Sequence, residues 1–174
     1  MVELLPEGEK VVGEKVVAAV LTVSDGVYLG VREDRSGDVL SELLEAARYD
    51  VVRKVVPDER ETIAAAVREL AGEARLVLTT GGTGVAPRDV TPEATLDVVD
   101  RLVPGVAETI RADSIARTPH GLLSRSVAGI LGSTLVVNLP GSPGGCRDGF
   151  AVLEVALGHA LELIAEQPTA HRQT

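Results

Sequence analysis

Residues 76–94 read LVLTTGGTGVAPRDVTPEA, and this stretch indicates the fold because a buried strand passes through a glycine loop into a helix. Its apolar start, residues 76–78, is typical of a strand covered on both faces. Three glycines in the loop 81–84 tolerate positive φ and, having no Cβ, let the backbone approach a ligand closely. Thr91-Pro92 predicts a helix N-cap followed by proline at the first helical position. Such a loop suits a phosphate, although a plain tight turn would need the same glycines.

Apolar runs with the length of strands alternate with segments of helical periodicity on both sides of this loop. The first three predicted strands are Val16–Val23, Tyr49–Val56 and Arg75–Thr80. The predicted helices begin near Ser36, Asp58, Pro92 and Pro104, and a closing helix covers about 147–166. This β-α-β-α-β order implies parallel strands joined by right-handed crossovers. We therefore predict an α/β fold in three layers, with a mostly parallel sheet and helices on both faces.

Three further segments complete the prediction. Ser124–Ile130 and Thr134–Leu139 have the pattern of a hairpin or a bent pair of strands. The polar residues 25–35 predict an exposed loop, and Asn138–Gly145 is a second loop rich in glycine and proline.

The composition is that of a well-packed domain without a membrane segment. The chain has 174 residues, 45% of them hydrophobic and 2% aromatic, so aliphatic side chains must build the core. We expect one domain at residues 16–166, an N-terminal arm at 1–15 and a tail at 167–174. No apolar run approaches the roughly 18 residues that span a bilayer, and the arm lacks the apolar segment of a signal peptide. The single cysteine, Cys146, excludes an intrachain disulfide and fits a cytoplasmic location.

An excess of acidic residues limits the kinds of partner. The chain has 17 Lys and Arg against 26 Asp and Glu, a formal net charge of −9. This charge excludes a nucleic-acid-binding surface, because phosphate backbones are held by basic patches. An anionic small molecule would need local attraction from loop amides, a divalent metal or arginines. Arg88 and Arg125 are the arginines best placed to supply it.

The turns that follow parallel strands meet at one edge of the sheet. Here these turns are Ser24-Asp25, Pro57–Glu59 and residues 81–89, with Asn138–Gly144 as a candidate fourth wall. Asp58 and Asp89 would then face the glycine loop. Two carboxylates, completed by water and by phosphate oxygens of a substrate, are ligands that suit Mg²⁺.

Both aspartates also have a structural interpretation. Asp58 precedes a helix, and Glu61 three residues later gives the spacing of a capping box, with Asp in place of Ser or Thr. Asp89 has the position of a surface-turn residue that pairs with its neighbour Arg88. Spacing alone leaves the structural and the catalytic role open for each aspartate.

A set of motifs occurs in a specific order over roughly residues 16–166. The longest is Gly81–Gly84 followed by Pro87–Thr95. The others are Leu21–Asp25, Arg35–Gly37, Val56–Glu59, Leu123–Ser126, Gly132–Thr134 and Asn138–Pro143. Together they closely resemble the signature of the molybdopterin adenylyltransferases, the MogA/MoaB family of molybdenum-cofactor biosynthesis, whose molybdopterin-binding fold they imply.

This resemblance implies an enzyme that transfers AMP from ATP to the terminal phosphate of molybdopterin and releases pyrophosphate. It implies that Asp58 holds Mg²⁺ and the ATP phosphates, and that Asp89 acts near the pterin and the metal, so both are catalytic and metal-binding residues. The other residues that it implies for binding molybdopterin and ATP are Ser24, Asp25, Gly81, Gly82, Thr83, Gly84, Arg88, Ser114, Asn138, Pro140, Gly141 and Ser142. It also implies a homotrimer, or a hexamer in the MoaB branch, and contact with the molybdenum insertase.

Two other functions are compatible with the same motifs. One is a molybdopterin-binding or scaffold protein of the MoaB type that adenylylates poorly. The other is a generic α/β enzyme that acts on a nucleotide or a phosphosugar. The presence of both Asp58 and Asp89 favours the adenylyltransferase.

Overall fold

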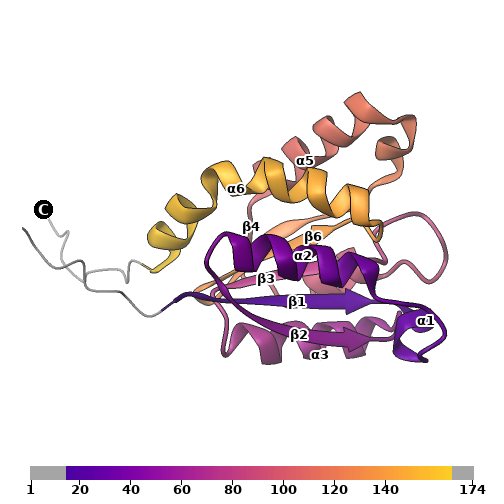
Figure 1. Cartoon of the computed structure of the whole chain (residues 1–174), viewed down its shortest axis with the longest axis horizontal. Coiled ribbons are helices and arrows are strands. Elements are labelled where there is room, and N and C mark those ends of the chain that lie inside the picture. The colour runs from indigo at the N-terminus through magenta and orange to yellow at the C-terminus, as the bar shows by residue number, and fades with distance from the viewer. Residues whose placement is uncertain (1–14, 166–174) are drawn as a thin grey trace, which may run out of the picture.

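The computed structural model describes residues 15–165, which form one six-stranded sheet with helices on both faces (Figure 1). Most of the predicted N-terminal arm and all of the predicted tail lie outside the described residues. Across the sheet, the strands are β2 (Asp50–Val56), β1 (Val17–Val23), β3 (Leu76–Thr80), β6 (Thr134–Leu139), β5 (Ala128–Leu131) and β4 (Arg101–Leu102). The first four are parallel, and β5 and β4 are antiparallel to their neighbours. The predicted mostly parallel sheet is therefore confirmed.

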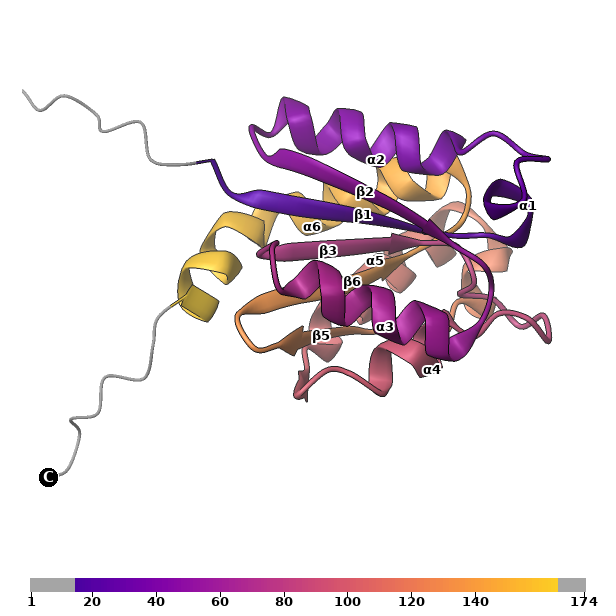
Figure 2. The same ribbon diagram turned by 90° about the horizontal axis from the view of Figure 1, so that it is seen from below.

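The helices form two layers, one on each face of the sheet (Figure 2). One layer contains α2 (Arg35–Ala46), α5 (Pro104–Arg117) and α6 (Pro143–Ala165), and the other contains α3 (Arg60–Ala71) and α4 (Thr91–Leu96). The short helix α1 (Asp25–Tyr28) follows β1, and a 3-10 helix, η1 (Pro119–Leu123), follows α5. Within residues 15–165, no helix combines the length and the apolar composition needed to cross a membrane.

Alternate residues of the central strands supply the two cores. Ala18 and Val20 of β1 pack with α2, α5 and α6, whereas Ala19 and Leu21 pack with α3 and α4. All four side chains are fully buried. Because both faces of the sheet are covered, a strand in its middle has no solvent side and is apolar along its length. The three predicted layers are confirmed.

The prediction of a loop over residues 25–35 is wrong at both ends of the segment, where helices α1 and α2 form. Ser24 caps α1, with its Oγ accepting a hydrogen bond of 3.3 Å from the amide of Val27. Asp34 caps α2, with its Oδ1 accepting one of 3.0 Å from the amide of Gly37. A polar, glycine-containing segment can therefore end in short capped helices, which the apolar periodicity does not reveal.

Two predicted helix caps are also wrong. Helix α3 starts at Arg60 after Glu59, which makes no side-chain cap bond, so Asp58 lies outside the helix. Helix α4 has Val90 as its N-cap, and Thr91 is the first helical residue. The Asp58 side chain instead accepts a hydrogen bond from the turn after β1, and the Thr91 hydroxyl donates to the carbonyl of Gly81 at the start of its own loop.

The later elements differ from prediction in their limits. The hairpin is confirmed, but β5 begins at Ala128 rather than Ser124. Helix α6 begins at Pro143, where the proline fits the first turn, rather than near 147. The two-residue strand β4 and the 3-10 helix η1 carry too little apolar pattern to be predicted from sequence.

Candidate active site

The carboxyl ends of β1, β2 and β3 open into a cavity of about 660 Å³. Residues from all three strand-end turns line it: Ser24, Asp58, Gly81, Gly82 and Asp89. Gly141 and Pro143, from the loop before α6, line it as well. The predicted convergence of these turns, including the fourth wall, is confirmed.

The turns after β1 and β2 are joined by a reciprocal pair of hydrogen bonds. The amide of Asp25 donates to Asp58 Oδ2 at 2.8 Å, and the amide of Asp58 donates to Asp25 Oδ1 at 3.0 Å. Arg88 then closes on Asp25 with two bonds, Nε to Oδ2 at 2.6 Å and Nη2 to Oδ1 at 2.9 Å. Asp25 is therefore held in an ion pair, while Asp58 lines the cavity and has no side-chain cation bound to it among the described residues.

The two aspartates consequently differ in acidity. Burial raises the pKa of Asp58, the negative charges of Asp25 and Asp89 raise it further, and the Asp25 amide and Arg88 oppose this shift. The hydrogen bond from Arg88 lowers the pKa of Asp25, assisted by the bond from the Asp58 amide. A carboxylate whose negative charge is disfavoured in this way gains most from a cation placed beside it.

The glycine loop needs its glycines for reasons of backbone geometry. Gly81 has φ +99°, and a Cβ there would lie 2.2 Å from the carbonyl oxygen of Val23. Gly82 has φ +66°, and a Cβ there would lie 2.4 Å from Thr91 Oγ1, which donates to the carbonyl of Gly81. The tight-turn interpretation is therefore correct, and because both glycines line the cavity, the ligand interpretation is compatible with it.

Asp89 ends the glycine loop on the same cavity. Its Oδ2 accepts a hydrogen bond of 2.9 Å from the amide of Ala86, which closes a local turn. The predicted surface pair between Asp89 and Arg88 is wrong, because the Arg88 guanidinium extends to Asp25 instead. Asp89 is close enough to Asp58 for its negative charge to contribute to the raised pKa of Asp58.

The prediction that Arg125 attracts an anionic ligand is not supported, because its guanidinium is already bonded to the protein. Arg125 pairs with Glu93, and its Nε donates to the carbonyl of Gly84 at 2.7 Å. Its Nη2 also donates to the carbonyl of Asp89. Arg125 therefore holds the backbone of the glycine loop in place from below.

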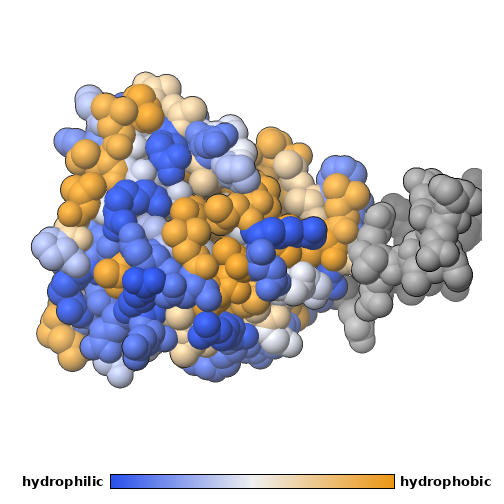
Figure 3. Space-filling model, turned by 180° about the vertical axis from the view of Figure 1, so that it is seen from behind, coloured by the Kyte–Doolittle hydropathy of each residue, from blue (hydrophilic) through white to orange (hydrophobic). Residues whose placement is uncertain are grey.

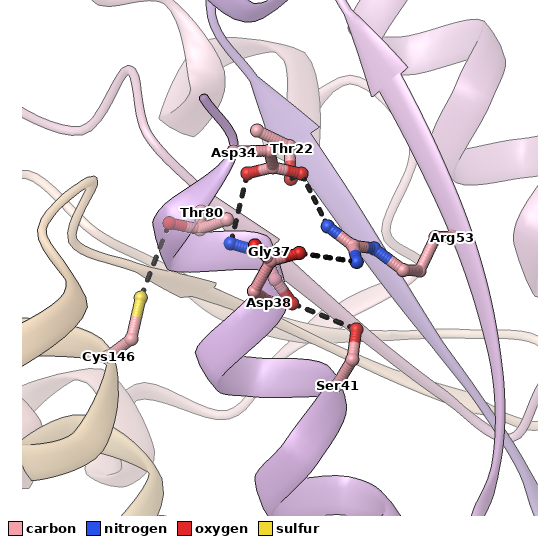
Figure 4. A network of polar contacts seen from close by, with 8 residues as sticks. All are labelled: Thr22, Asp34, Gly37, Asp38, Ser41, Arg53, Thr80 and Cys146. Atoms are coloured by element: carbon pink, nitrogen blue, oxygen red, sulfur yellow. Dashed lines mark hydrogen bonds and ion pairs between the residues drawn. The ribbon is translucent and has the colours of Figure 1, made fainter. Parts of the chain in front are cut away.

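Asp34 forms the centre of a polar network that fixes the wall beside α2 (Figure 4). Besides capping Gly37, its carboxylate accepts bonds of 2.8 Å from Thr22 Oγ1 and from Arg53 Nη2. On the neighbouring strand β3, Thr80 pairs in register with Thr22, and its Oγ1 lies 3.3 Å from the sulfur of Cys146. Burial raises the pKa of Cys146 to about 11, so this thiol is not a nucleophile at neutral pH and packs as a core residue.

A second cavity of about 450 Å³ adjoins the first, because two loops supply residues to both. Predicted site residues that line it are Thr83, Gly84, Ser114, Pro140 and Ser142. Each of the loops 81–84 and 140–143 therefore lines both cavities: some of its residues line the first cavity and their neighbours line the second. Asp113, Arg117 and His120 line the second cavity and were not predicted.

Three predicted site residues lie elsewhere. Asp25 and Arg88 form the ion pair behind Asp58, outside the lining of both cavities. Asn138 is buried, and its Nδ2 donates to the hydroxyls of Thr79 and Thr95, at 2.9 Å each. Asn138 therefore connects β6, β3 and α4 beneath the loops, instead of facing a cavity.

The sequence reasoning missed several residues that line the first cavity, among them Thr22, Arg32, Arg35 and Ser36. Arg35-Ser36 stands in a motif that was noted, whereas Arg32 falls in the segment predicted as an exposed loop. The signal for Arg32 was its position near the end of β1, since loops at that edge of the sheet carry the site.

Magnesium fits the donor atoms of the first cavity. Asp58 and Asp89 each use Oδ2 to accept a backbone hydrogen bond, which leaves Oδ1 available. Within residues 15–165, no group of three or more His, Cys, Asp or Glu side chains could hold a metal ion. Two available carboxylate oxygens suit Mg²⁺, which takes one or two carboxylates and completes its shell with water and substrate phosphates.

Fold and site together define a class: a doubly covered α/β protein with two adjoining cavities at the carboxyl edge of its parallel strands. The family model described as a probable molybdopterin binding domain matches residues 19–159, and the chain belongs to this family. It is 38% identical to a molybdopterin adenylyltransferase of Helicobacter pylori over 150 residues. The matched region covers 83% of this chain and 85% of that protein. A solved structure of the molybdopterin biosynthesis enzyme MoaB from Thermus thermophilus has a TM-score of 0.81 and 43% identity, covering 88% of this chain and 98% of that one.

Some relatives are much longer than this chain. The molybdenum cofactor synthesis protein cinnamon of Drosophila melanogaster is 39% identical over 165 residues, which cover 92% of this chain and 28% of that protein. The chain thus spans little more than a quarter of that relative. The predicted resemblance to the MogA/MoaB family and its fold is confirmed, and the relatives named molybdopterin adenylyltransferases are enzymes of the nucleotidyltransferase class.

Proposed function

We propose that this chain is a molybdopterin adenylyltransferase, which transfers AMP from ATP to the phosphate of molybdopterin in a Mg²⁺-dependent reaction. The observation that carries the proposal is the position of Asp58 and Asp89 in a cavity that adjoins a second one at two glycine-rich loops, each of which supplies residues to both cavities. The name of the relatives supports the same reaction.

In this reaction an oxygen of the molybdopterin phosphate attacks the α-phosphorus of ATP and forms a new P–O bond. The bond from that phosphorus to the oxygen bridging to the β-phosphate breaks, and pyrophosphate leaves with the electron pair. Both reactants are anions, so catalysis consists mainly of positioning and neutralisation of charge. The phosphate monoester is already a nucleophile near neutral pH, and no strong general base is required.

The two cavities suggest how the substrates are placed. We assign ATP to the cavity with the aspartates and molybdopterin to the one that Ser114 lines, so that the reacting phosphates meet at the shared loops 81–84 and 140–143. Gly81 and Gly82 allow close approach of backbone to phosphate there. Asp58 and Asp89 are the residues that would hold Mg²⁺. When bound, Mg²⁺ supplies positive charge at the phosphate oxygens that an acidic chain lacks.

The test is a transfer assay with purified protein, molybdopterin, ATP and Mg²⁺. Formation of adenylylated molybdopterin together with pyrophosphate is the expected result. Binding of molybdopterin without any adenylylated product would instead indicate the scaffold protein of the MoaB type. Turnover of ATP that is independent of molybdopterin, and unaffected by Asp58→Asn or Asp89→Asn, would indicate a generic nucleotide enzyme.

Assembly and location belong to the same proposal. Apolar side chains gather on the face shown in Figure 3, and exposed large apolar residues of the described chain include Leu102, Leu122 and Val155. Because monomers rarely expose such surface in patches, these features support a homo-oligomer, for which the family resemblance suggests a trimer or a hexamer. Contact with the molybdenum insertase stays a prediction of that resemblance, and a cytoplasmic location stays a prediction from the single cysteine.

A further inference from the structure

Arg32 lines the first cavity, and its side chain takes no part in the hydrogen bonds and ion pairs of the site among residues 15–165. It lies between α1 and α2 and lines the cavity together with Arg35 and the carboxylates of Glu33, Asp58 and Asp89. These two arginines are the only basic residues in that lining. Any anion that enters the cavity of this acidic chain depends on them for positive charge from the protein.

The two arginines differ in their existing partners. Arg35 is paired with Glu33, with an Nη2 to Oε2 distance of 3.0 Å. Within residues 15–165, the Arg32 guanidinium has no hydrogen-bond acceptor and no carboxylate within salt-bridge distance. Other arginines near the site are committed too, Arg88 to Asp25 and Arg53 to Asp34 and Asp38. Arg32 is thus the cation of this cavity that retains its full capacity for a ligand.

The backbone and stem of Arg32 are held in place. The amides of Val31 and Arg32 donate to the carbonyl of Gly26 at 2.9 and 3.0 Å. The side chain lies along Gly26, where an added Cβ would be 3.4 Å from the Arg32 Cβ and 3.5 Å from its Nε. Two residues later, Asp34 is anchored by its network (Figure 4). The backbone and the start of the side chain are therefore fixed beside the cavity, and the exposed guanidinium is left to bind a ligand.

We propose that Arg32 binds the β- and γ-phosphates of the nucleotide and stabilises the pyrophosphate that leaves. This inference rests on the proposed function. The reacting α-phosphate belongs at the loops shared with the second cavity, whereas Arg32 lines the first cavity and is absent from the lining of the second. The planar fork of a guanidinium fits two phosphate oxygens at once, which an ammonium group cannot do.

The test compares Arg32→Gln, Arg32→Lys and the control Arg101→Gln. Arg101 is exposed on β4, at the far edge of the sheet from β2, so this control removes the same charge outside both cavities. Calorimetry with pyrophosphate and Mg²⁺, and the KM for ATP in the transfer assay, are the measurements. We expect Arg32→Gln to raise the Kd for pyrophosphate and the KM for ATP by about 10- to 100-fold each, because a charge-assisted hydrogen bond is lost. Arg32→Lys should recover part of the loss, and Arg101→Gln should resemble the parent.

The outcomes separate this inference from the function itself. An Arg32→Gln variant that folds and keeps the parent Kd for pyrophosphate and KM for ATP overturns the inference. Equal losses in Arg32→Gln and Arg101→Gln also overturn it, because net charge would then explain both. If the parent protein binds pyrophosphate through Arg32 but forms no adenylylated molybdopterin, the proposed reaction fails while the binding role of Arg32 stands.

Discussion

The loops after β1 and β2 each carry an aspartate, and the two form almost the same backbone contacts with opposite electrostatic results. Each carboxylate accepts a hydrogen bond from the amide of the other residue. Asp25 has in addition the guanidinium of Arg88, and its pKa is lowered. Asp58 faces the cavity, and burial raises its pKa.

This difference shows how one type of residue can take two roles at one edge of a sheet. The ion pair of Asp25 and Arg88 links the first turn to the glycine loop and holds the second turn through the amide of Asp58. Asp58 receives this support and keeps one oxygen for a ligand. We therefore interpret Asp25 as a positioning residue and Asp58 as the residue that contacts metal and substrate.

The strongest test of this comparison is Asp58→Asn. Transfer of AMP should fall by about 100- to 1000-fold, because the charge that holds Mg²⁺ beside the phosphates is lost. The fold should persist, since the asparagine Oδ1 can still accept the hydrogen bond from the amide of Asp25. Initial rates at saturating ATP and Mg²⁺ measure the loss.

Asp97→Asn is a matched control for this variant, because Asp97 lies outside both cavities and pairs with Arg60 on the surface. It should retain the parent rate. Circular dichroism of Asp58→Asn should match that of the parent. A folded Asp58→Asn variant with full activity would contradict the assignment of Asp58.

Asp25→Asn should have a smaller effect on transfer, about tenfold, which is typical for residues that orient a ligand-binding group. Arg88→Gln should cause a similar loss, because it breaks the same ion pair from the other side. The double variant should then be little worse than either single variant, since both remove one interaction.

Rates of the three variants at varied Mg²⁺ measure this coupling. Losses that multiply in the double variant would mean that Asp25 and Arg88 act independently. A loss for Asp25→Asn as large as that for Asp58→Asn would remove the distinction between a positioning residue and a metal-binding one.

The sequence predicted the elements that have a strong apolar pattern or glycines with a geometric purpose. The parallel strands, the convergence of their turns and the glycine loop were all predictable, because burial on both faces and positive φ restrict the residue types. The same reasoning placed Asp58 at the site, because Asp58 follows the end of β2 and the turns after parallel strands meet at one edge of the sheet.

Partners of charged side chains were not predictable in the same way. Spacing suggested that Asp58 caps α3 and that Arg88 pairs with Asp89, yet Asp58 bonds to the turn after β1, and Arg88 pairs with Asp25. These contacts join residues far apart in the chain, and local spacing has no information on them. Arg32 was missed for a related reason, because its loop is polar and its role depends on how it folds back over Gly26.

The smallest predicted effect concerns the pH dependence of stability without Mg²⁺. Asp25 has a lowered pKa when folded, so its charge stabilises the protein above the pKa of the unfolded chain, near pH 4. That stabilisation is lost as the pH falls through the folded pKa. Asp58 has a raised pKa when folded, so ionisation of its carboxyl destabilises the fold. This destabilisation begins as the pH rises above the pKa of the unfolded chain, about 4, and is complete above the folded pKa.

At pH 7, therefore, Asp25→Asn should melt below the parent protein and Asp58→Asn at or above it. Both differences should shrink as the pH falls. The difference for Asp58→Asn should vanish below about pH 4, and that for Asp25→Asn only at lower pH, as the pH falls through the lowered pKa of Asp25. Added Mg²⁺ should raise the melting temperature of the parent but not of Asp58→Asn, because a ligand stabilises only the state that binds it. If Asp58→Asn melts well below the parent at pH 7, Asp58 is a structural anchor like Asp25, and the contrast between the two turns disappears.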